Sequence, residues 1–507
     1  MPEVEHFEAE AAPERIGIVH LGLGAFHRAH QAVYLQHCLE AGQREWGLCS
    51  VNLRANHALV TGLRAQQGRY HVAEYRDREH VTLREITAIC EALFTGRGAG
   101  EVVPDDLSVL LERLEAPSTR IVTLTVTEKG YCLSPASGRL RFDDPTIAED
   151  LETPEQPRSA PGLLVEGLRR RRAAGVVPFA VLSCDNMPSN GRRVRAAVIE
   201  LAQRLDEQRG DDLADWIARE VAFPSSMVDR IVPAMDERAH RELAGLGVDD
   251  PAAVTCEVYS QWVIEDDFPA GRPDWAAFGV EMVADVTPFE TMKLRMLNGS
   301  HSLLAYVGVM AGFETVSEAV ADPAMAALIH GYMHDEAAPT LTLPVGVDPA
   351  AYAERLLVRF SNDSLHHRLQ QIAMDGSQKL PQRWLHGARC QLAGERPRIA
   401  AVALGVAAWI RYTAGRDGRG ELFEPSDPLV VTLQARHRQS TSLASLVTAM
   451  LGITEIFPVE LADDARFYGA VLEALDRIDR YGMAAALQYH VEQEADASKS
   501  VEQGNRS

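Results

Sequence analysis

Several features that mark common protein classes are missing from this chain of 507 residues. Its seven cysteines are scattered and include no Cys-x-x-Cys pair, which excludes a structural zinc knuckle and argues against a disulfide framework in a chain of this size. The longest apolar run, residues 399–410, is too short to span a bilayer. Because acidic residues rather than a basic segment follow Met1, we expect no signal peptide and a cytoplasmic protein.

Positive charge is scarce, and lysine is the scarcest source of it. The chain carries 50 basic and 72 acidic residues, a net charge of −22, which argues against nucleic acid or an anionic membrane as a partner. Only four of the 50 basic residues are lysine, which leaves 46 arginines. A lysine that persists against this bias marks a position that arginine cannot fill. The four are Lys129, Lys293, Lys379 and Lys499.

Several catalytic signatures are also missing. The chain has no Tyr-x-x-x-Lys pair of the short-chain dehydrogenases, and no His-Glu-x-x-His motif or cysteine cluster for a catalytic zinc. Gly-x-Ser-x-Gly and the P-loop are missing as well. We therefore do not predict the chemistry of a short-chain dehydrogenase, of a catalytic zinc in these motifs, of a serine nucleophile or of a P-loop.

Strands and helices alternate through the first 210 residues, and this alternation predicts an α/β fold with a Rossmann-type doubly wound parallel sheet. We expect residues 70–93 to form antiparallel strands inserted into that pattern, and residues 1–14 to be loose. The β-branched runs that predict the parallel strands are residues 16–21, 46–53, 120–127 and 178–183.

The pattern of predicted elements changes near residues 285–288. Beyond them, long Ala- and Leu-rich helical segments dominate and few strands are predicted. A chain of this length exceeds a single core. We therefore predict two domains: residues 1–286 as a Rossmann-type dinucleotide-binding domain, and residues 287–507 as a mostly α-helical substrate and catalytic domain.

Gly22-x-Gly24 lies between the first predicted strand and a helix and is half of the dinucleotide fingerprint. The two glycines would allow a tight turn and a close approach of the pyrophosphate to the helix N-terminus. His27 stands where a third glycine is usual, and residues 52–57, after the second strand, contain no carboxylate for a ribose. An ordinary strand-to-helix turn is the alternative. A dinucleotide is predicted, with the choice between NAD and NADP open.

A second motif lies at the start of the helical region. Thr287 to Glu290 reads as a capping box with proline at the first helical position. At about 100° per residue, Asn298 lies about 140° and His301 about 80° from Lys293 around the helix. These three side chains are therefore predicted to share one side of it.

Lysine, asparagine and histidine on one side suit a hydride-transfer site. Lysine becomes a general base when burial lowers its pKa from ~10.4 toward ~7–8, whereas arginine stays charged. Asn298 would donate a hydrogen bond to the developing alkoxide, and His301 would orient the substrate hydroxyl. Glu290 fits either a capping role or a proton relay. The alternative is that Lys293 is an ordinary surface charge.

Four further polar segments fit both a ligand site and a plain turn. Two of them follow predicted strands, where open α/β sheets bind ligands. The third places Asp229 beside Arg230 in an apolar stretch, and the fourth is a loop whose Lys379 could reach a polar substrate. The segments are residues 127–131, 183–191, 223–233 and 374–381.

Taken together, these blocks resemble the mannitol dehydrogenase family, the polyol-specific long-chain dehydrogenases/reductases. The Lys-x4-Asn-x2-His spacing and the block FPSSMVDRIVP are specific, and the matching blocks run in family order over most of the chain. They are GLGAFHRAHQ, TVTEKGY, SCDNMPSNG, FPSSMVDRIVP, KLRMLNGSH, RFSND and DGSQKLP.

The resemblance implies a metal-independent, NAD(P)-dependent oxidation of a sugar alcohol to a ketose. By position, Lys293 resembles the family's general base, and Asn190 and Asn298 the pair that holds the substrate oxygen. His301 resembles the orienting group and Glu290 the proton relay.

The resemblance also implies contacts with both small molecules. Lys379 resembles a substrate contact, and the family-like enzyme is expected to be a monomer that binds no nucleic acid and no membrane. The residues expected to face the cofactor are Gly22, Leu23, Gly24, Ala25, Phe26 and Asp229.

The resemblance favours members that interconvert D-mannitol and D-fructose. D-arabinitol dehydrogenases and fructuronate or tagaturonate reductases are alternatives within the class. A uronate carboxylate would need a cation, and the scarcity of basic residues in the matched blocks favours a neutral polyol. A non-catalytic dinucleotide-binding sensor is the alternative outside the class, and the joint retention of Lys293, Asn298 and His301 argues against it.

Overall fold

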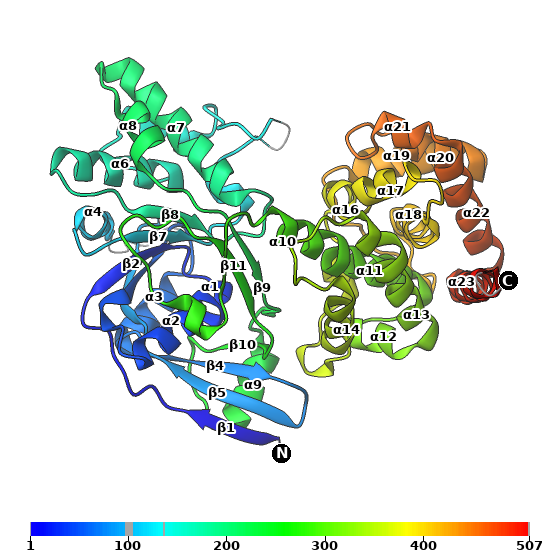
Figure 1. Cartoon of the computed structure of the whole chain (residues 1–507), viewed down its shortest axis with the longest axis horizontal. Coiled ribbons are helices and arrows are strands. Elements are labelled where there is room, and N and C mark those ends of the chain that lie inside the picture. The colour runs from blue at the N-terminus through cyan, green and yellow to red at the C-terminus, as the bar shows by residue number, and fades with distance from the viewer. Residues whose placement is uncertain (1, 97–104, 135–136, 505–507) are drawn as a thin grey trace. The chain divides into compact units, whose positions relative to one another are not determined.

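The computed structural model describes residues 2–96, 105–134 and 137–504 (Figure 1). The chain forms two compact units, Met1–Thr287 and Pro288–Ser507.

A five-stranded parallel sheet, in the order β6-β3-β2-β7-β8, forms the centre of the N-terminal unit. The order of the strands along the chain reverses between β2 and β7. A doubly wound sheet binds its ligand at such a point, outside the carboxyl ends of the strands. The predicted Rossmann-type sheet is therefore confirmed. Its strands are β2 (Ile16–Leu21), β3 (Gly47–Asn52), β6 (Ile89–Phe94), β7 (Ile121–Leu124) and β8 (Ala180–Ser183).

Helices cover both faces of this sheet (Figure 1). Val19 and Val122 face one core, which α4, α6, α7 and α8 complete, while Ile18 and Ile121 face the core beneath α1, α2 and α3. Successive strand residues point to opposite faces, so runs that are apolar throughout bury both. The helices of the unit are α1 (Ala25–Ala29), α2 (Gln31–Glu40), α3 (His57–Ala65), α4 (Leu107–Glu115), α5 (Pro145–Glu152), α6 (Ala160–Ala173), α7 (Asn190–Arg209), α8 (Leu213–Glu220) and α9 (Glu237–Gly245).

The inserted strands are only partly as the sequence predicts. β4 (Tyr70–Tyr75) and β5 (His80–Ile86) pair antiparallel, as expected. The expectation is wrong for β6, which pairs parallel with β3 and forms the edge of the central sheet. Period-two alternation identifies a strand but carries no information about its partner, which long-range pairing decides.

The N-terminal segment also differs from expectation. Residues 1–14 are predicted to be loose, yet β1 (Glu3–Phe7) pairs parallel with β5. It completes a second sheet of order β1-β5-β4-β10, in which β10 is Val254–Glu257. A polar strand of this kind is stabilised by its partner's backbone rather than by burial, so its composition gives little sign of it.

A third, three-stranded sheet carries the block FPSSMVDRIVP. β9 (Ser226–Asp229) pairs antiparallel with β11 (Gln261–Glu265), and β11 pairs parallel with β12 (Glu281–Val283). Asp229 is thus the last residue of a buried strand.

The C-terminal unit is built from helices joined by loops, as predicted, around one large apolar core. Three of its segments are π-helical turns: Lys293–Asn298, here called the lysine turn, Tyr332–Ala337 and Pro381–Leu385. The α-helices are α10 (Thr287–Met292), α11 (Gly299–Ala311), α12 (Val316–Ala321), α13 (Pro323–Gly331), α14 (Pro349–Phe360), α15 (Leu369–Ile372), α16 (Gly376–Leu380), α17 (His386–Leu392), α18 (Ala400–Tyr412), α19 (Val430–Gln439), α20 (Leu443–Leu451), α21 (Val459–Ala462), α22 (Ala465–Tyr481) and α23 (Met483–Gly504).

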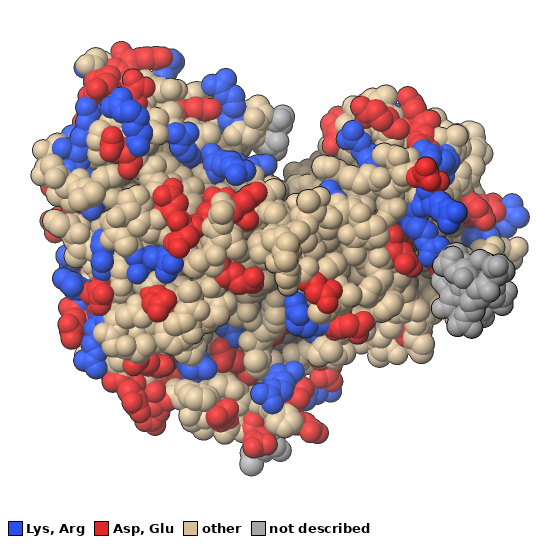
Figure 2. Space-filling view, in the orientation of Figure 1, with Lys and Arg blue, Asp and Glu red and all other residues tan. Residues whose placement is uncertain are grey.

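The surface matches the composition. On the face that Figure 2 draws, acidic and basic side chains are interspersed over both units. In the part of the chain that the structure describes, no helix combines the length and the apolar character needed to cross a bilayer.

Candidate active site

The glycine turn follows β2 at the carboxyl edge of the central sheet. Gly22 has a φ of +110°, and a Cβ there would lie 2.0 Å from the carbonyl oxygen of Thr125 in the segment after β7. Glycine is therefore required for the close approach of these two segments. Gly24 precedes α1, whose first turn receives no side-chain cap from the described residues. Its backbone amides are thus available to an anion.

The position of the missing third glycine has a structural role. His27 stacks on His20 with ring centroids 3.4 Å apart, and its Nε2 lies 3.0 Å from Ser50 Oγ on β3. Burial lowers the pKa of His20 to about 3 and holds the pKa of His27 well below its usual range, so both rings are neutral. Neutral stacked imidazoles fill the space between α1 and the sheet. A motif search cannot recognise this substitution, because the fingerprint expects glycine there.

Asn190, expected to hold a substrate oxygen, begins α7 and is fully buried. Its Nδ2 donates to the carbonyl oxygens of Asp185 and Ser226 at 3.0 and 2.7 Å. Its Oδ1 accepts from the amides of Ser226 and Gly191 at 3.0 and 2.8 Å. Both amide hydrogens are thus committed to the backbone, and a substrate contact requires one of these bonds to be exchanged. The substrate role stays a prediction, whereas the structural role is plain.

We predict that Asn190→Ala destabilises the protein even without ligands. Leaving buried backbone groups unpaired costs about 1–3 kcal/mol each, so the Tm of the ligand-free protein should fall by several degrees. Gln208→Ala, which removes an exposed side-chain amide from the same helix α7, is the matched control and should change Tm little. An unchanged Tm for Asn190→Ala, measured by thermal unfolding, would contradict the structural role.

Asp185 is a site-edge residue that sequence reasoning did not single out. Its carboxylate accepts the amides of Val126 and Thr127 at 3.0 and 2.8 Å and the Tyr131 hydroxyl at 2.6 Å. Burial raises the pKa of Asp185 above its usual value. Thr127 has a φ of +62°, a strained conformation for a β-branched residue. Asp185 therefore holds the loop after β7 in place beside the glycine turn.

The base of the adjacent acid and base in FPSSMVDRIVP bonds to residues outside that block. Arg230 is buried and donates to Glu74 Oε1 at 2.7 Å and to the carbonyl oxygen of Glu257 at 2.9 Å. Asp229 is also buried, at the end of β9. Arg230 thus links the second and third sheets, while the cofactor contact predicted for Asp229 stays a prediction.

In the C-terminal unit, the predicted lysine helix is interrupted by the lysine turn. A π-helical turn bonds residues five apart, so Asn298 stands one turn above Lys293 rather than about 140° around the helix. His301 follows in α11, within one turn of Asn298. Lys293, Asn298, His301 and Glu290 are 7%, 6%, 8% and 8% exposed, so each is buried. A surface role for Lys293 is thereby wrong.

Tyr332 supports the lysine turn from a second π-helical turn. Its hydroxyl donates to the carbonyl oxygen of Arg295, inside the lysine turn, at 2.6 Å. A Cβ on Gly299 would lie 2.0 Å from that hydroxyl oxygen. The Asn298-Gly299 pair, unusual for a helix, therefore has a reason: glycine leaves room for the hydroxyl that bonds the turn's carbonyl.

The third π-helical turn completes this support. Arg383 donates to the carbonyl oxygen of Asn298 at 3.2 Å and to Ser302 Oγ at 2.9 Å. The Trp384 indole donates to the carbonyl oxygen of Gly299 at 3.0 Å. Carbonyls at the end of the lysine turn are thus bonded by side chains from another helix. Sequence reasoning missed Tyr332, Arg383 and Trp384, because their relation to Lys293 is entirely tertiary.

His301 is prepared to bind a polar group. Its Nε2 is buried and has no hydrogen-bond partner among the described residues. Its ring lies near Phe360 and His367, with centroids 5.0 and 5.4 Å away. Burial first, and then His367 and neighbouring cations, hold the pKa of His301 well below its usual range. A neutral imidazole with an unpaired buried nitrogen suits a substrate hydroxyl.

Lys379 lies in α16, where its Nζ donates to the carbonyl oxygen of Ile372 at 3.2 Å. Burial lowers the pKa of Lys379 to about 8, with a further lowering from the charge of Arg383. Lys379 and the lysine turn are thus linked through Arg383, which binds Asn298.

Cations gather around His301. The charges of Arg383, Arg359 and Lys293 all act on its ring. Arg359 comes from the block RFSND and is buried, as is Arg295 in the lysine turn. The scarcity of basic residues within the matched blocks describes only those blocks, whereas folding also places Arg383, from outside them, among the cations near His301.

Comparison with known proteins decides the family. Models of the mannitol dehydrogenase Rossmann domain and the mannitol dehydrogenase C-terminal domain match residues 16–277 and 285–479. The chain belongs to the mannitol dehydrogenase family. It is therefore an oxidoreductase, a polyol dehydrogenase of this family.

Relatives of this mannitol dehydrogenase family chain align over nearly its whole length. The D-mannonate oxidoreductase of Escherichia coli is 48% identical over 92% of this chain and 93% of its own. A Pseudomonas fluorescens mannitol 2-dehydrogenase, solved as a ternary complex with NAD and D-mannitol, is 33% identical with a TM-score of 0.82 over 97% of both chains. A D-sorbitol dehydrogenase is 30% identical with a TM-score of 0.84, over 96% of this chain and 97% of its own.

Proposed function

We propose that this protein oxidises a secondary alcohol of a sugar derivative to a ketone with NAD, using Lys293 as the general base. The observation that carries the proposal is the buried set on the lysine turn and α11: Lys293, Asn298 one turn above it, and His301 with an unpaired Nε2. These are the groups that such a reaction needs, in one short stretch of helix.

The glycine turn fits a dinucleotide. Gly22 brings β2 and the segment after β7 close together, and among the described residues no side chain caps the first turn of α1. We propose that residues 22–26 hold the pyrophosphate there and that Asp229 faces the cofactor. Bound NAD supplies a hydride acceptor. Residues 52–57, at the end of β3, contain no carboxylate to bind a ribose hydroxyl, and Arg54 among them is exposed. An arginine at this place can bind the 2′-phosphate of NADP, so NADP is the alternative cofactor.

The proton chemistry falls to the C-terminal unit. In its uncharged form, the amine of Lys293 takes the proton of the substrate hydroxyl. Asn298 donates to the oxygen as negative charge develops on it, and neutral His301 orients the hydroxyl. Glu290, buried one helical turn before Lys293, passes the proton on. The polarisation that a catalytic zinc provides elsewhere comes here from these donors, so we propose a reaction without a metal.

We propose a sugar acid of the D-mannonate type as the substrate. Arg383 and Arg359 add positive charge around His301, and the charge of Arg383 also acts on Lys379. Cations of this kind suit the carboxylate of a sugar acid. The relative named D-mannonate oxidoreductase shares 48% identity. D-mannitol is the second candidate, supported by the likeness to the enzyme solved with NAD and D-mannitol. We also propose that the enzyme works as a monomer, which light scattering would test.

The charge of Lys379 separates the two candidates. Its pKa of about 8 keeps it cationic below that pH and neutral above it. If it binds a carboxylate, the KM for D-mannonate should rise by up to about fivefold between pH 8 and pH 9 relative to the KM for D-mannitol, because the cationic fraction of Lys379 falls by that factor. The ratio of the two KM values is the readout, because effects of the shared base cancel in it.

Lys379→Met should abolish this pH dependence and raise the KM for D-mannonate more than that for D-mannitol. A flat ratio, together with a higher kcat/KM for D-mannitol, would identify the neutral polyol as the substrate. If the protein turned over none of D-mannonate, D-mannitol, D-arabinitol and D-sorbitol with either NAD or NADP, the proposed function would be wrong. The alternative of a non-catalytic dinucleotide-binding sensor would then be favoured.

A further inference from the structure

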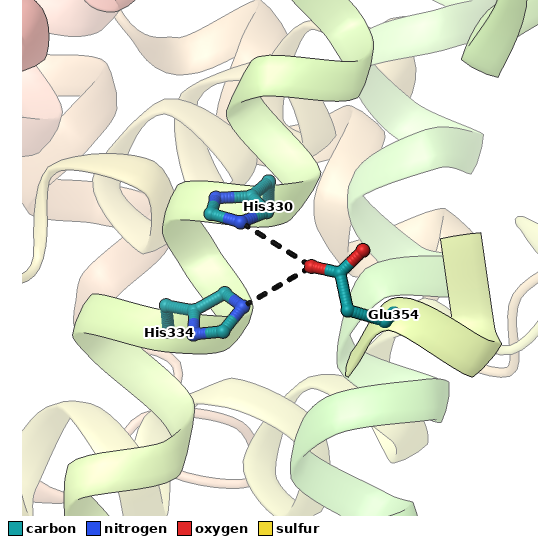
Figure 3. A group of neighbouring side chains, drawn as sticks. All are labelled: His330, His334 and Glu354. Atoms are coloured by element: carbon teal, nitrogen blue, oxygen red, sulfur yellow. Dashed lines mark ion pairs between the residues drawn. The ribbon is translucent and has the colours of Figure 1, made fainter. Parts of the chain in front are cut away.

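Two histidines and a glutamate converge on the surface of the C-terminal unit (Figure 3). His330 is the next-to-last residue of α13, His334 lies in the π-helical turn that follows, and Glu354 comes from α14. The Nε2 atoms of both histidines point at the same carboxylate oxygen, Glu354 Oε1, at 3.7 and 3.9 Å. The two rings lie side by side with centroids 4.2 Å apart. Nothing in the proposed reaction uses these residues.

The distances from the two Nε2 atoms to Glu354 Oε1 are too long for hydrogen bonds. They are closer to the distances between neighbouring ligand atoms around a bound metal ion. In a tetrahedral zinc site with bonds of ~2.1 Å, ligand atoms are about 3.4 Å apart. The ligand atoms of the three side chains all lie within 4.8 Å of one another, so they would have to close by up to about 1.4 Å to reach that spacing. His334 Nε2 is buried and, among the described residues, has no hydrogen-bond partner, so a group that satisfies this nitrogen is missing from the protein itself.

The donor set selects the kind of ion. Two imidazoles and one carboxylate suit zinc and similar transition metals, whereas magnesium and calcium prefer oxygen donors throughout. Histidines four residues apart lie on one helical face, a spacing that recurs in zinc sites. The exposed fractions of His330, His334 and Glu354 are 51%, 28% and 65%, so an ion reaches them from solvent and a water can complete the coordination.

We propose that His330, His334 and Glu354 form a binding site for zinc or a similar divalent transition metal. The ion would join α13 and the turn after it to α14. Tyr332 lies between the two histidines in the chain, and its hydroxyl donates to the carbonyl of Arg295 in the lysine turn. A metal on the outer side of this segment therefore braces the segment whose inner side supports Lys293.

The test uses isothermal titration of the full-length protein with zinc chloride and a parallel thermal unfolding series. Exposed Cys90 and Cys390 are replaced by serine in every sample, because thiolates also bind zinc. Three variants probe the site: His330→Ala/His334→Ala, Glu354→Gln, and the control His80→Ala. His80 is a matched control because it also faces carboxylates, with its Nδ1 2.8 Å from Asp77 and its Nε2 3.9 Å from Glu3.

We expect one zinc per chain with micromolar affinity, an increase in Tm with zinc, and no response to magnesium. The double histidine variant should bind at least about 100-fold more weakly, and Glu354→Gln should also lose affinity, while His80→Ala binds like the parent. An absence of zinc binding would overturn the site. Binding that survives in the double histidine variant would overturn it as well, because the ion would then lie elsewhere.

Discussion

Lys293→Ala should lower kcat by about 10²–10⁴-fold, the usual contribution of a positioned general base. In the proposed mechanism the buried amine of Lys293 takes the hydroxyl proton, and no other lysine lies on the lysine turn or α11. The measurement is steady-state turnover of D-mannonate and D-mannitol with NAD. Binding of NADH, followed by fluorescence, should stay close to that of the parent, because the residues proposed to bind the cofactor belong to the N-terminal unit.

Two further variants test whether residue 293 acts as a general base or only through its positive charge. Lys293→Arg keeps a cation but cannot lose its proton, so it should be as inactive as the alanine variant. Lys129→Ala removes an exposed lysine after β7 and should retain activity, since no physical reason connects that side chain to proton transfer. Parent-like turnover of Lys293→Ala or of Lys293→Arg would show that the base is another group.

Gly299→Ala should damage both stability and turnover. Its Cβ would lie 2.0 Å from Tyr332 Oη and 2.8 Å from Cζ of the same ring, so the tyrosine must move. Overpacking of this kind costs about 1–3 kcal/mol. The Tm of a unit of this size falls by roughly 2–4 °C per kcal/mol. Loss of the hydrogen bond to the Arg295 carbonyl would also shift the lysine turn, and a misplacement of about 1 Å costs about 100-fold in rate.

Gly331→Ala is the matched control, next in the chain to Tyr332. Gly331 has helical dihedral angles, and a Cβ there meets none of the described atoms within 4 Å. Alanine should therefore leave turnover unchanged and stabilise the helix by up to about 1 kcal/mol. Thermal unfolding and kcat are measured on both variants. If Gly299→Ala kept the Tm and kcat of the parent, the packing of Tyr332 against the lysine turn would contribute neither to stability nor to turnover.

The predicted site and the observed one agree where local rules suffice. Scarcity singled out Lys293, and helical spacing grouped it with Asn298 and His301. The 100° periodicity was the wrong geometry, because the segment is a π-helical turn. A π-helical turn is less favourable than an α-helical one and depends here on side chains from other helices. Tyr332 and Arg383 lie at least about thirty residues away in the chain, so no local pattern contains them.

For Asn190, the sequence predicted the position of the residue, but the structure shows a different use of its side chain. Its segment, SCDNMPSNG, follows a strand at the edge where α/β sheets bind ligands, which made a substrate role reasonable. The structure shows that its four hydrogen-bonding positions are occupied by backbone groups from three segments. Sequence can place such a residue at the right edge, but only the folded chain shows how its hydrogen bonds are used.

By itself, the sequence determined the layout of this protein. Alternating strands and helices, the glycine turn and the Ala-rich second half follow from periodicity and backbone sterics, which act over a few residues, and they defined the α/β fold and the family. The tertiary structure alone decided what lies beside Lys293. Burial and charge depend on which distant segments pack together. Arginines spread along the chain therefore became a cationic cluster around His301, and His330, His334 and Glu354 became neighbours.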